Sequence, residues 1–305
     1  MKKTLISLFT VICTVLLLSS CNLSQNVSGM DESDTCFQTS GQSDEEKIYT
    51  LVFDGSEYKY TGDISAIKAE GSSVTLTKAA KYLLSGVLDN GQLVIDAGES
   101  GQVYLVFSNL NISCQFSAPV YVKSADKVII ELASGSSNSL TDAKSYSYAS
   151  EEKTEPNACL FSDCDLTISG SGSLKINGNY NNGIGCQNNL SIKGGDITVS
   201  AANNAVKGGR SVTVEGGNLT VDQAVNGIIT ESIRDSEGFI LIAGGNFSVT
   251  CSGDALKASR SILINGGSAF LAPQNKNYMC QYKNDAGKDI CGNVTVNTTE
   301  WPAVN

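Results

Sequence analysis

The sequence contains no histidine and comparatively few basic residues. Its 305 residues include 21 Lys and Arg against 31 Asp and Glu, a formal net charge of −10. Nucleic-acid binding depends on clustered basic side chains that neutralise phosphates, so this balance argues against a nucleic-acid partner. Without histidine and without a Cys-x-x-Cys pair, the usual zinc-ligand spacings do not occur.

The chain also lacks an apolar run long enough to span a bilayer. Residues 4–18 (TLISLFTVICTVLLL) form an apolar run, shorter than the roughly 20 residues that a transmembrane helix needs. Lys2 and Lys3 precede the run and polar sequence follows it. This order is typical of an export signal peptide and disfavours a permanent transmembrane helix.

The end of the predicted signal peptide is Leu18-Ser19-Ser20-Cys21. It resembles the bacterial lipobox, in which an aliphatic residue and two small residues precede a cysteine that receives lipid before cleavage. We expect residues 1–20 to be removed and Cys21 to be lipidated; the alternative is an ordinary secretory signal with a chance cysteine. Lipid chains contribute about 0.8 kcal/mol per buried methylene. The protein would then be exported and anchored to the bacterial membrane by lipid alone, facing the cell surface or the periplasm.

Residues 21–47 are rich in Ser, Gln, Asp and Glu and poor in large apolar side chains. Such a composition predicts a flexible acidic tether, because it cannot form a core. Loss of Lys2 and Lys3 with the signal leaves 19 basic against 31 acidic residues, a net charge of −12. The remaining residues suffice for one large repetitive domain, which we expect to be monomeric.

Eight cysteines follow Cys21, an even number that permits disulfides outside the cytoplasm. Eight cysteines allow 105 pairings, so the sequence alone assigns none. Cys280 and Cys291 are the nearest candidates for a local pair. Free buried thiols are the alternative.

Five segments of the second half share one pattern of apolar residues and glycine. Each has apolar residues at positions 1 and 3 and a glycine-containing corner at positions 5 and 6, and successive starts are 24, 22, 28 and 22 residues apart. Alternation predicts short strands, glycine predicts tight corners, and a period near 22 predicts one coil of a solenoid per repeat. The segments are LTISGSGSLKI from Leu166, LSIKGGDITVS from Leu190, VTVEGGNLTVD from Val212, ILIAGGNFSVT from Ile240 and ILINGGSAFLA from Ile262.

This period predicts an all-β fold, a single-stranded right-handed parallel β-helix with lateral loops, over residues 48–272. Weaker coils can be followed upstream, and residues 273–305 would be a C-terminal cap or tail. Residues 134–157 interrupt the period and are expected to project as a loop, and residues 230–238 make a smaller excursion. A β-sandwich is the alternative, but it would need a hairpin at every connection and no column of glycine corners.

A column of polar residues precedes the strands: Asn182, Asn204, Asn226 and Asp254. Equivalent positions on successive coils lie about 4.8 Å apart, so the column forms a ladder of side-chain oxygens. Such oxygens suit a hard cation, and we take these four residues as candidate metal ligands. The alternative is a scaffold in which each amide bonds its neighbour.

Two coils also share the matching segments AVKGGRSVTVEGG and ALKASRSILINGG, which align Lys207 with Lys257 and Arg210 with Arg260. Both pairs should flank the oxygen column, about 10 Å apart. A positive cluster there could hold sugar carboxylates. Basic side chains on a solvated face of an acidic domain are the alternative.

The projecting loop contributes carboxylates and tyrosines. Clustered carboxylates suit calcium, and tyrosine rings suit sugar rings; loop tyrosines that pack the loop against the stack are the alternative. The candidate ligands are Asp142, Glu155, Asp163 and Asp165, and the candidate sugar-binding rings are Tyr146, Tyr148 and Tyr180.

Several blocks occur in an order that resembles one family, the bacterial carbohydrate-binding β-helix proteins related in fold to pectate lyases. The blocks are YLLSGVLDNGQL from Tyr82, YVKSADKV from Tyr121, NSLTD from Asn138, EPNA from Glu155 and GNYNNGI from Gly178, and the match covers about residues 75–272. The resemblance implies a right-handed parallel β-helix, calcium bound along it, and affinity for plant cell-wall polysaccharides such as cellulose and polygalacturonate. In this chain three Asp-Gly-Ile units of the family have asparagine in place of aspartate, which would weaken some calcium sites.

These observations leave three functions open. The first is a surface-anchored, non-catalytic carbohydrate-binding protein assisted by calcium. The second is a polysaccharide lyase in which calcium acidifies the uronate proton and Lys207 or Lys257 removes it. The third is a structural or adhesin-like surface protein without a sugar ligand.

Overall fold

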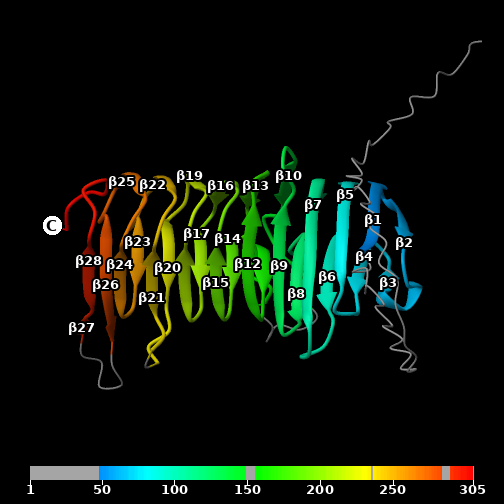
Figure 1. The fold of residues 1–305 in the computed structure, drawn as a ribbon, viewed down its shortest axis with the longest axis horizontal. Helices are drawn as coiled ribbons and strands as arrows, with labels where there is room; N and C mark the ends of the chain where they lie inside the picture. Colours follow the sequence, from blue (N-terminus) through cyan, green and yellow to red (C-terminus); the bar gives the residue numbers. More distant parts are fainter. Residues whose placement is uncertain (1–47, 149–154, 235, 284–288, 305) are drawn as a thin grey trace, which may run out of the picture. The chain divides into compact units, whose positions relative to one another are not determined.

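The structure is a computed structural model that describes residues 48–148, 155–234, 236–283 and 289–304. Strands follow one another in stacked coils from β1 to β28, and most pairings are parallel (Figure 1). The described residues contain no α-helix and one 3-10 helix, η1 (Ile64–Ala66). The structure therefore confirms the all-β parallel β-helix that the period predicted. Nowhere in the described ranges is there a helix long and apolar enough to cross a membrane.

Each coil contributes strands to three faces. The first face stacks β4 (Ser73–Leu76), β6 (Gln92–Asp96), β8 (Val120–Ser124), β11 (Ala158–Ser162), β14 (Asn182–Cys186), β17 (Asn204–Gly208), β20 (Asn226–Thr230), β23 (Leu256–Ala258) and β26 (Tyr278–Lys283). The second face stacks β9 (Lys127–Leu132), β12 (Asp165–Gly170), β15 (Asn189–Ile192), β18 (Ser211–Val214), β21 (Phe239–Ile242), β24 (Ser261–Ile264) and β28 (Asn293–Val296). The third face stacks β10 (Ser137–Thr141), β13 (Ser173–Gly178), β16 (Asp196–Ala201), β19 (Asn218–Gln223), β22 (Asn246–Cys251) and β25 (Ser268–Pro273).

The repeated sequence segments correspond to the second face, a corner and the third face. Apolar positions fall in register from coil to coil, as in the row formed by Ile192, Val214 and Ile242, each at most 1% exposed. Each such side chain contributes about 1.5–3 kcal/mol when it leaves water. The second glycine of the corners, such as Gly195 (φ 95°) and Gly217 (φ 86°), adopts a left-handed conformation that other residues rarely take. The period therefore records two strands and the glycine turn between them.

The two ends of the stack use other pairings. At the N-terminal end β1 (Ile48–Gly55) pairs antiparallel with β2 (Glu57–Thr61), and β3 (Ile67–Glu70) pairs antiparallel with β4. The long strands β5 (Lys81–Leu88) and β7 (Gln102–Ser113) then begin the regular coils, and β7 bonds both β9 and β10. At the other end β26 and β28 extend the stack beyond residue 272, the expected end of the solenoid, and β27 (Asp289–Cys291) pairs antiparallel with β26.

The C-terminal segment covers the last coil. The Trp301 ring packs on Phe247 with ring centroids 4.9 Å apart, and its indole N–H donates to the Gly266 carbonyl at 3.2 Å. The Ala269 N–H donates to the Glu300 carbonyl at 3.0 Å, which continues the third face by one more bond. The segment thus shields core side chains and backbone groups that would otherwise end the stack in water.

The interruption after Leu132 is smaller than the sequence predicted. Residues 137–141 form β10, which pairs with both β7 and β13, so the expected loop from residue 134 is wrong for these residues. Asn138 causes the difference, because it is a polar residue at an inward position. It is 2% exposed; its Oδ1 accepts from the Leu110 N–H and its amide donates to Ser173 O.

Five cysteines in the described ranges are free thiols buried in the solenoid: Cys114, Cys159, Cys164, Cys186 and Cys251. Burial raises the pKa of Cys186 to about 12, so this thiol stays protonated and unreactive at neutral pH. Cys36 and the side chain of Cys291 lie outside what the structure describes, and a Cys280–Cys291 bond stays a prediction.

Candidate functional site

The asparagine column forms a continuous ladder of hydrogen bonds at the start of the first-face strands. Asn204 Nδ2 donates to Asn182 Oδ1 at 2.8 Å, and Asn226 Nδ2 donates to Asn204 Oδ1 at 2.8 Å. The Asp254 N–H donates to Asn226 Oδ1 at 3.0 Å. Asn157 precedes the column and Asn275 follows it, bonded to Asn182 and Asp254 respectively.

These contacts use the oxygens that were predicted to bind a cation. Asn182, Asn204 and Asp254 are at most 5% exposed. A buried amide that bonds on both sides satisfies its own polar groups and fixes the stacking register. The geometry therefore favours the scaffold alternative for Asn182, Asn204, Asn226 and Asp254.

The predicted basic positions are in register but lie away from the ladder. Lys207 and Lys257 are separated by Ile229 on β20, two coils apart as expected. Lys207 follows Asn204 by three residues on β17, about 10 Å along an extended strand, so the two side chains lie at different ends of that strand.

Lys207 and Arg210 instead line a depression where the first face turns into the second. This charged depression has a volume of about 410 Å³ and is bordered by the excursion after β20. Lys207 Nζ lies 2.6 Å from Glu231 Oε2, and Arg210 Nε lies 3.5 Å from Glu237 Oε1. The lining residues are Gln187, Asn188, Lys207, Gly209, Arg210, Glu231, Ser232, Ile233, Arg234 and Glu237.

Arg260 supports the charged depression from the next coil. Its Nε and Nη2 donate to the Ile233 carbonyl at 3.2 and 2.8 Å and so hold the excursion in place. Lys257 is exposed and has no ion-pair partner in the described part of the chain. Three basic and two acidic side chains line the charged depression, and Glu155 lies beside it, bonded to the lining residue Gln187.

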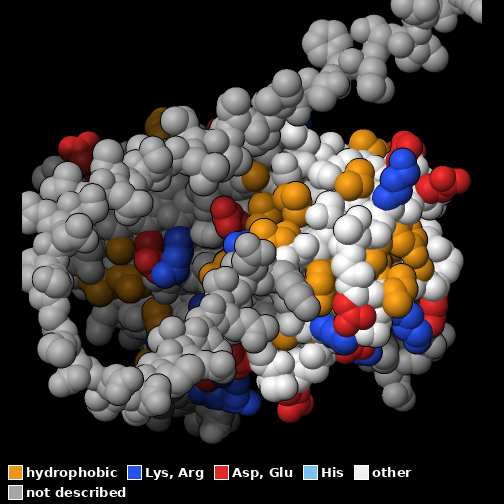
Figure 2. Space-filling model, turned by 45° about the vertical axis from the view of Figure 1, so that its right-hand side comes forward, with side chains coloured by type: hydrophobic (Ala, Val, Ile, Leu, Met, Phe, Trp, Pro, Cys, Tyr) orange, Lys and Arg blue, Asp and Glu red, His pale blue; other side chains and the backbone are white. Residues whose placement is uncertain are grey.

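Some basic side chains elsewhere are also paired with acids. On the face shown in Figure 2, blue basic side chains lie beside red acidic ones. The structure pairs Lys78 with Asp63 at 2.6 Å and Lys68 with Glu70 at 2.9 Å. Both pairs are exposed, and such pairs contribute little to stability.

The three candidate tyrosines form one cluster that secures the loop. Tyr146 stacks on Tyr180 with ring centroids 4.2 Å apart, and Tyr148 Oη lies 3.2 Å from Tyr180 Oη. Tyr146 also donates to Asp142 Oδ2 at 2.6 Å, and Tyr148 donates to the Pro156 carbonyl at 2.9 Å. All three rings are partly exposed. Their contacts match the alternative in which the tyrosines pack the loop against the stack.

Asp142 is the buried anchor of this loop. It is 4% exposed, accepts from Tyr146, and also accepts from the Asn179 N–H. Burial raises the pKa of Asp142 to about 6, although the hydrogen bonds from Tyr146 and Asn179 oppose the shift. Asp142 is thus committed to the loop rather than open to a ligand.

Of the other predicted metal ligands, Glu155 and Asp163 are both partly buried carboxylates. Burial raises the pKa of both carboxyls, and the charge on Asp163 raises the pKa of Glu155 further. Glu155 accepts from Gln187 Nε2, and Asp163 accepts from Tyr121 Oη at 2.9 Å. Asp165 is used by the stack, since it accepts from the N–H and Nδ2 of Asn189. No group of three or more acidic or cysteine residues in the described ranges is arranged to hold a metal ion.

A second concave region, which the sequence did not indicate, lies where the third face turns into the first. Two depressions of about 370 and 340 Å³ share Ala201, Ala202 and Gln223 and so form one corner groove. Its lining comprises Thr141, Asn177, Gly178, Asn179, Ser200, Ala201, Ala202, Asp222, Gln223, Ala224, Val225, Thr250, Cys251, Ser252, Ala272 and Gln274. The sequence pattern that could have indicated this groove is the run of small residues at the end of each third-face strand.

Comparisons with known proteins place this geometry in a family. The model of a family described as carbohydrate-binding domain-containing protein matches residues 70–300. The chain belongs to this family. A protein of Acetivibrio thermocellus with the same description is 42% identical over 164 residues, which are 54% of this chain and 57% of that protein. The aligned part thus spans little more than half of that relative's length.

A solved structure supports the same fold. It is described as the polysaccharide lyase-like protein from C. thermocellum, gadolinium derivative, and it aligns with a TM-score of 0.78 at 35% identity. The alignment covers 84% of this chain and 99% of that one. The family resemblance inferred from the sequence blocks is therefore confirmed, as is the β-helix.

Proposed function

We propose that this family member is a non-catalytic carbohydrate-binding protein that captures plant cell-wall polysaccharide at the bacterial surface. The charged depression is the observation that carries this proposal for acidic polymers such as polygalacturonate. Lys207, Arg210 and Arg234 offer several N–H donors to sugar carboxylates, and Gln187 and Asn188 offer amides to sugar hydroxyls.

The depression suits weak, exchangeable binding to a long polymer. The side chains of Lys207 and Arg210 are 26% and 44% exposed, and their glutamate partners are within reach of a competing carboxylate. A uronate would replace Glu231 or Glu237 as the acceptor, so the net gain per contact is small. Affinity for a polymer would then come from repeated contacts along the chain.

Calcium and the membrane anchor belong to the proposal as well. Glu155 and Asp163 supply two carboxylates beside the charged depression, fewer than the six to eight oxygens that calcium takes. The sugar would provide further oxygens if calcium bridged protein and uronate. Lipid on Cys21 and the tether of residues 21–47 would hold the domain at the membrane surface.

The proposal is tested by binding of polygalacturonate to the purified protein in affinity electrophoresis and calorimetry. Lys207→Ala with Arg210→Ala should weaken binding by about tenfold, the effect of about 1.4 kcal/mol. The matched control Lys175→Ala with Lys193→Ala removes the same charge on other faces and should change affinity less than about twofold. Equal losses in both double variants would mean that only net charge matters and would reject the depression as the site.

A lyase is the second candidate, because the solved relative is described as polysaccharide lyase-like. Lys207 is the candidate base, but its ammonium is bound to Glu231 at 2.6 Å and would have to lose both that contact and its proton first. Incubation with polygalacturonate and calcium, followed by ultraviolet absorbance of the unsaturated product, distinguishes the two. A calcium-dependent increase that Lys207→Ala abolishes would favour the enzyme.

A further inference from the structure

The corner groove differs in chemistry from the charged depression. Asp222 is the single charged residue in its lining as the structure describes it. The remainder consists of side-chain amides, hydroxyls, alanines, Gly178, Val225 and Cys251. A groove of this kind offers no cation to a carboxylate, and it offers both donors and acceptors to uncharged hydroxyls.

Its course follows the stacking axis. The lining passes from Thr141 on β10 through Asn177, Ser200 and Gln223 to Thr250 on β22 and Ala272 on β25. These six coils are about 4.8 Å apart, so the groove extends over about 24 Å. A ligand that uses this length must itself be extended and repetitive.

Two polar side chains of the corner groove are available to a ligand. Gln223 and Gln274 are exposed, and neither side chain has a hydrogen-bond partner among the residues the structure describes. Other amides hold the scaffold, as Asn177 does by donating to Thr141 Oγ1 at 2.9 Å. Ala202 and Ala224 leave room between the amides, where the apolar face of a sugar ring can lie.

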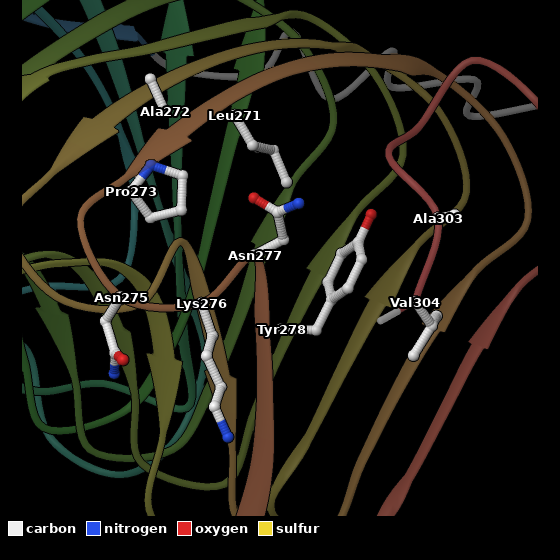
Figure 3. Close-up of a pocket in the computed structure, with 9 residues that line it drawn as sticks. All are labelled: Leu271, Ala272, Pro273, Asn275, Lys276, Asn277, Tyr278, Ala303 and Val304. Carbon is white, nitrogen blue, oxygen red and sulfur yellow. The ribbon is translucent and has the colours of Figure 1, made fainter.

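The groove continues into a third depression at the C-terminal end, which shares Ala272 with it. Figure 3 shows Leu271 and Asn277 pointing toward one another there, with the Tyr278 ring between Asn277 and the segment of Ala303 and Val304. Lys276 extends away from them in the same view. Among the described residues, Lys276 is the one charged side chain that the lining of this third depression adds, beside apolar and amide groups.

We infer that the corner groove is a second polysaccharide site, which binds an uncharged glycan chain lying parallel to the stacking axis. The inference rests on the proposed function, since it takes a polysaccharide as the ligand. It assigns neutral and acidic polymers to different edges of the solenoid. One molecule could then contact both at once, because the two sites lie at opposite ends of the first-face strands.

The test uses cellohexaose as the neutral probe and polygalacturonate as the acidic one, with the full-length protein and calorimetry. Ala202→Trp fills the groove and should weaken cellohexaose binding by at least about tenfold. Gln223→Ala removes one exposed amide and should weaken it about threefold, the loss of one hydrogen bond. Polygalacturonate binding should be unchanged in both variants.

The controls repeat each substitution outside the groove, at Ala69→Trp on β3 and Gln102→Ala on β7, and should leave both affinities unchanged. Thermal unfolding checks each fold, and Gln223→Ala keeps the test valid if Ala202→Trp does not fold. If the protein binds polygalacturonate but not cellohexaose, or if groove and control variants have equal effects on cellohexaose binding, the inference is overturned and the proposed function stays intact. Failure of the wild-type protein to bind either probe overturns both.

Discussion

Asn204 shows how one residue of the ladder supports two coils. Its amide donates to Asn182 and its Oδ1 accepts from Asn226, and the side chain is 4% exposed. Asn204→Ala would leave the partly buried Asn226 Nδ2 without its acceptor, and Asn182 Oδ1 with only the backbone N–H of residue 204 at 3.3 Å. An unpaired buried group costs about 1–3 kcal/mol, so we predict a loss of about 1–3 kcal/mol in the free energy of unfolding by urea.

The control for this prediction is Asn246→Ala. Asn246 Nδ2 makes the same kind of bond, to Asn218 Oδ1 at 2.9 Å, but the pair is exposed to water. This variant should lose less than about 1 kcal/mol, because water replaces the partner. Similar losses in the two variants would show that burial of the ladder contributes nothing.

Asp142 should make stability depend on pH. Burial raises the pKa of Asp142 in the folded protein to about 6, above the usual pKa of an aspartate, so the folded protein holds the proton more tightly than the unfolded chain. The stabilising effect is complete below about pH 4 and is lost as pH rises through 6. Relative to Asp142→Asn, the wild-type protein should lose about 2 kcal/mol of unfolding free energy between pH 4 and 7.

Urea unfolding of both proteins across this pH range measures the difference. An asparagine can accept from the Asn179 N–H through Oδ1 and donate to Tyr146 Oη, so the variant should fold. A difference in stability that stays constant with pH would exclude Asp142 as the titrating group.

At the scale of single strands and turns, the excursion after β20 sets the charge of the depression. Glu231 and Glu237 pair with Lys207 and Arg210, so they compete with an acidic ligand. Glu231→Gln should therefore strengthen polygalacturonate binding several-fold in calorimetry. Glu215→Gln removes an acid paired with Lys193 at 3.2 Å on another face and should have no such effect; equal strengthening would refute a local role for Glu231.

The C-terminal segment should be a cap on which the last coil depends. Trp301 is 4% exposed and packs on Phe247. Trp301→Ala removes this contact and should cost about 3–5 kcal/mol, which is typical of a buried large aromatic residue. Hydrogen exchange should accelerate in β24 and β25 while β12 and β13 stay protected, because each coil contacts only its neighbours. Uniform acceleration along the chain would contradict the cap.

Strands were predictable from the sequence where alternation was regular. LSIKGGDITVS gave β15, a glycine corner and β16, because inward apolar residues and corner glycines both leave a local pattern. The strand β10 was not predicted, because Asn138 places a polar residue at an inward position and breaks the alternation. Its side chain is hydrogen-bonded by Leu110 and Ser173 from other coils. The corner groove was not predictable, since its lining joins residues from six successive coils. The role of the asparagines as a scaffold was not predictable either. It depends on hydrogen bonds to Asn157 and Asn275, which lie outside the column formed by Asn182, Asn204, Asn226 and Asp254.

At the scale of the whole molecule, export and anchoring remain predictions from residues 1–47. Cys21→Ser should prevent lipid attachment and move the protein from the membrane to the soluble fraction of its host. Metabolic labelling with a radioactive fatty acid should lose its signal at the same time. Cys36→Ser is the control and should stay labelled. Loss of labelling in Cys36→Ser but not in Cys21→Ser would mean that Cys36 carries the lipid and would contradict the prediction.

The central claim is that this β-helix binds polysaccharide and does not cleave it. The most direct measurement is a plant-glycan array probed with the purified protein, with and without calcium, together with ultraviolet detection of unsaturated products from the bound polymers. We predict retention on polygalacturonate or cellulose, with no unsaturated product. Absence of binding to every glycan, or a calcium-dependent rise in unsaturated product, would contradict it.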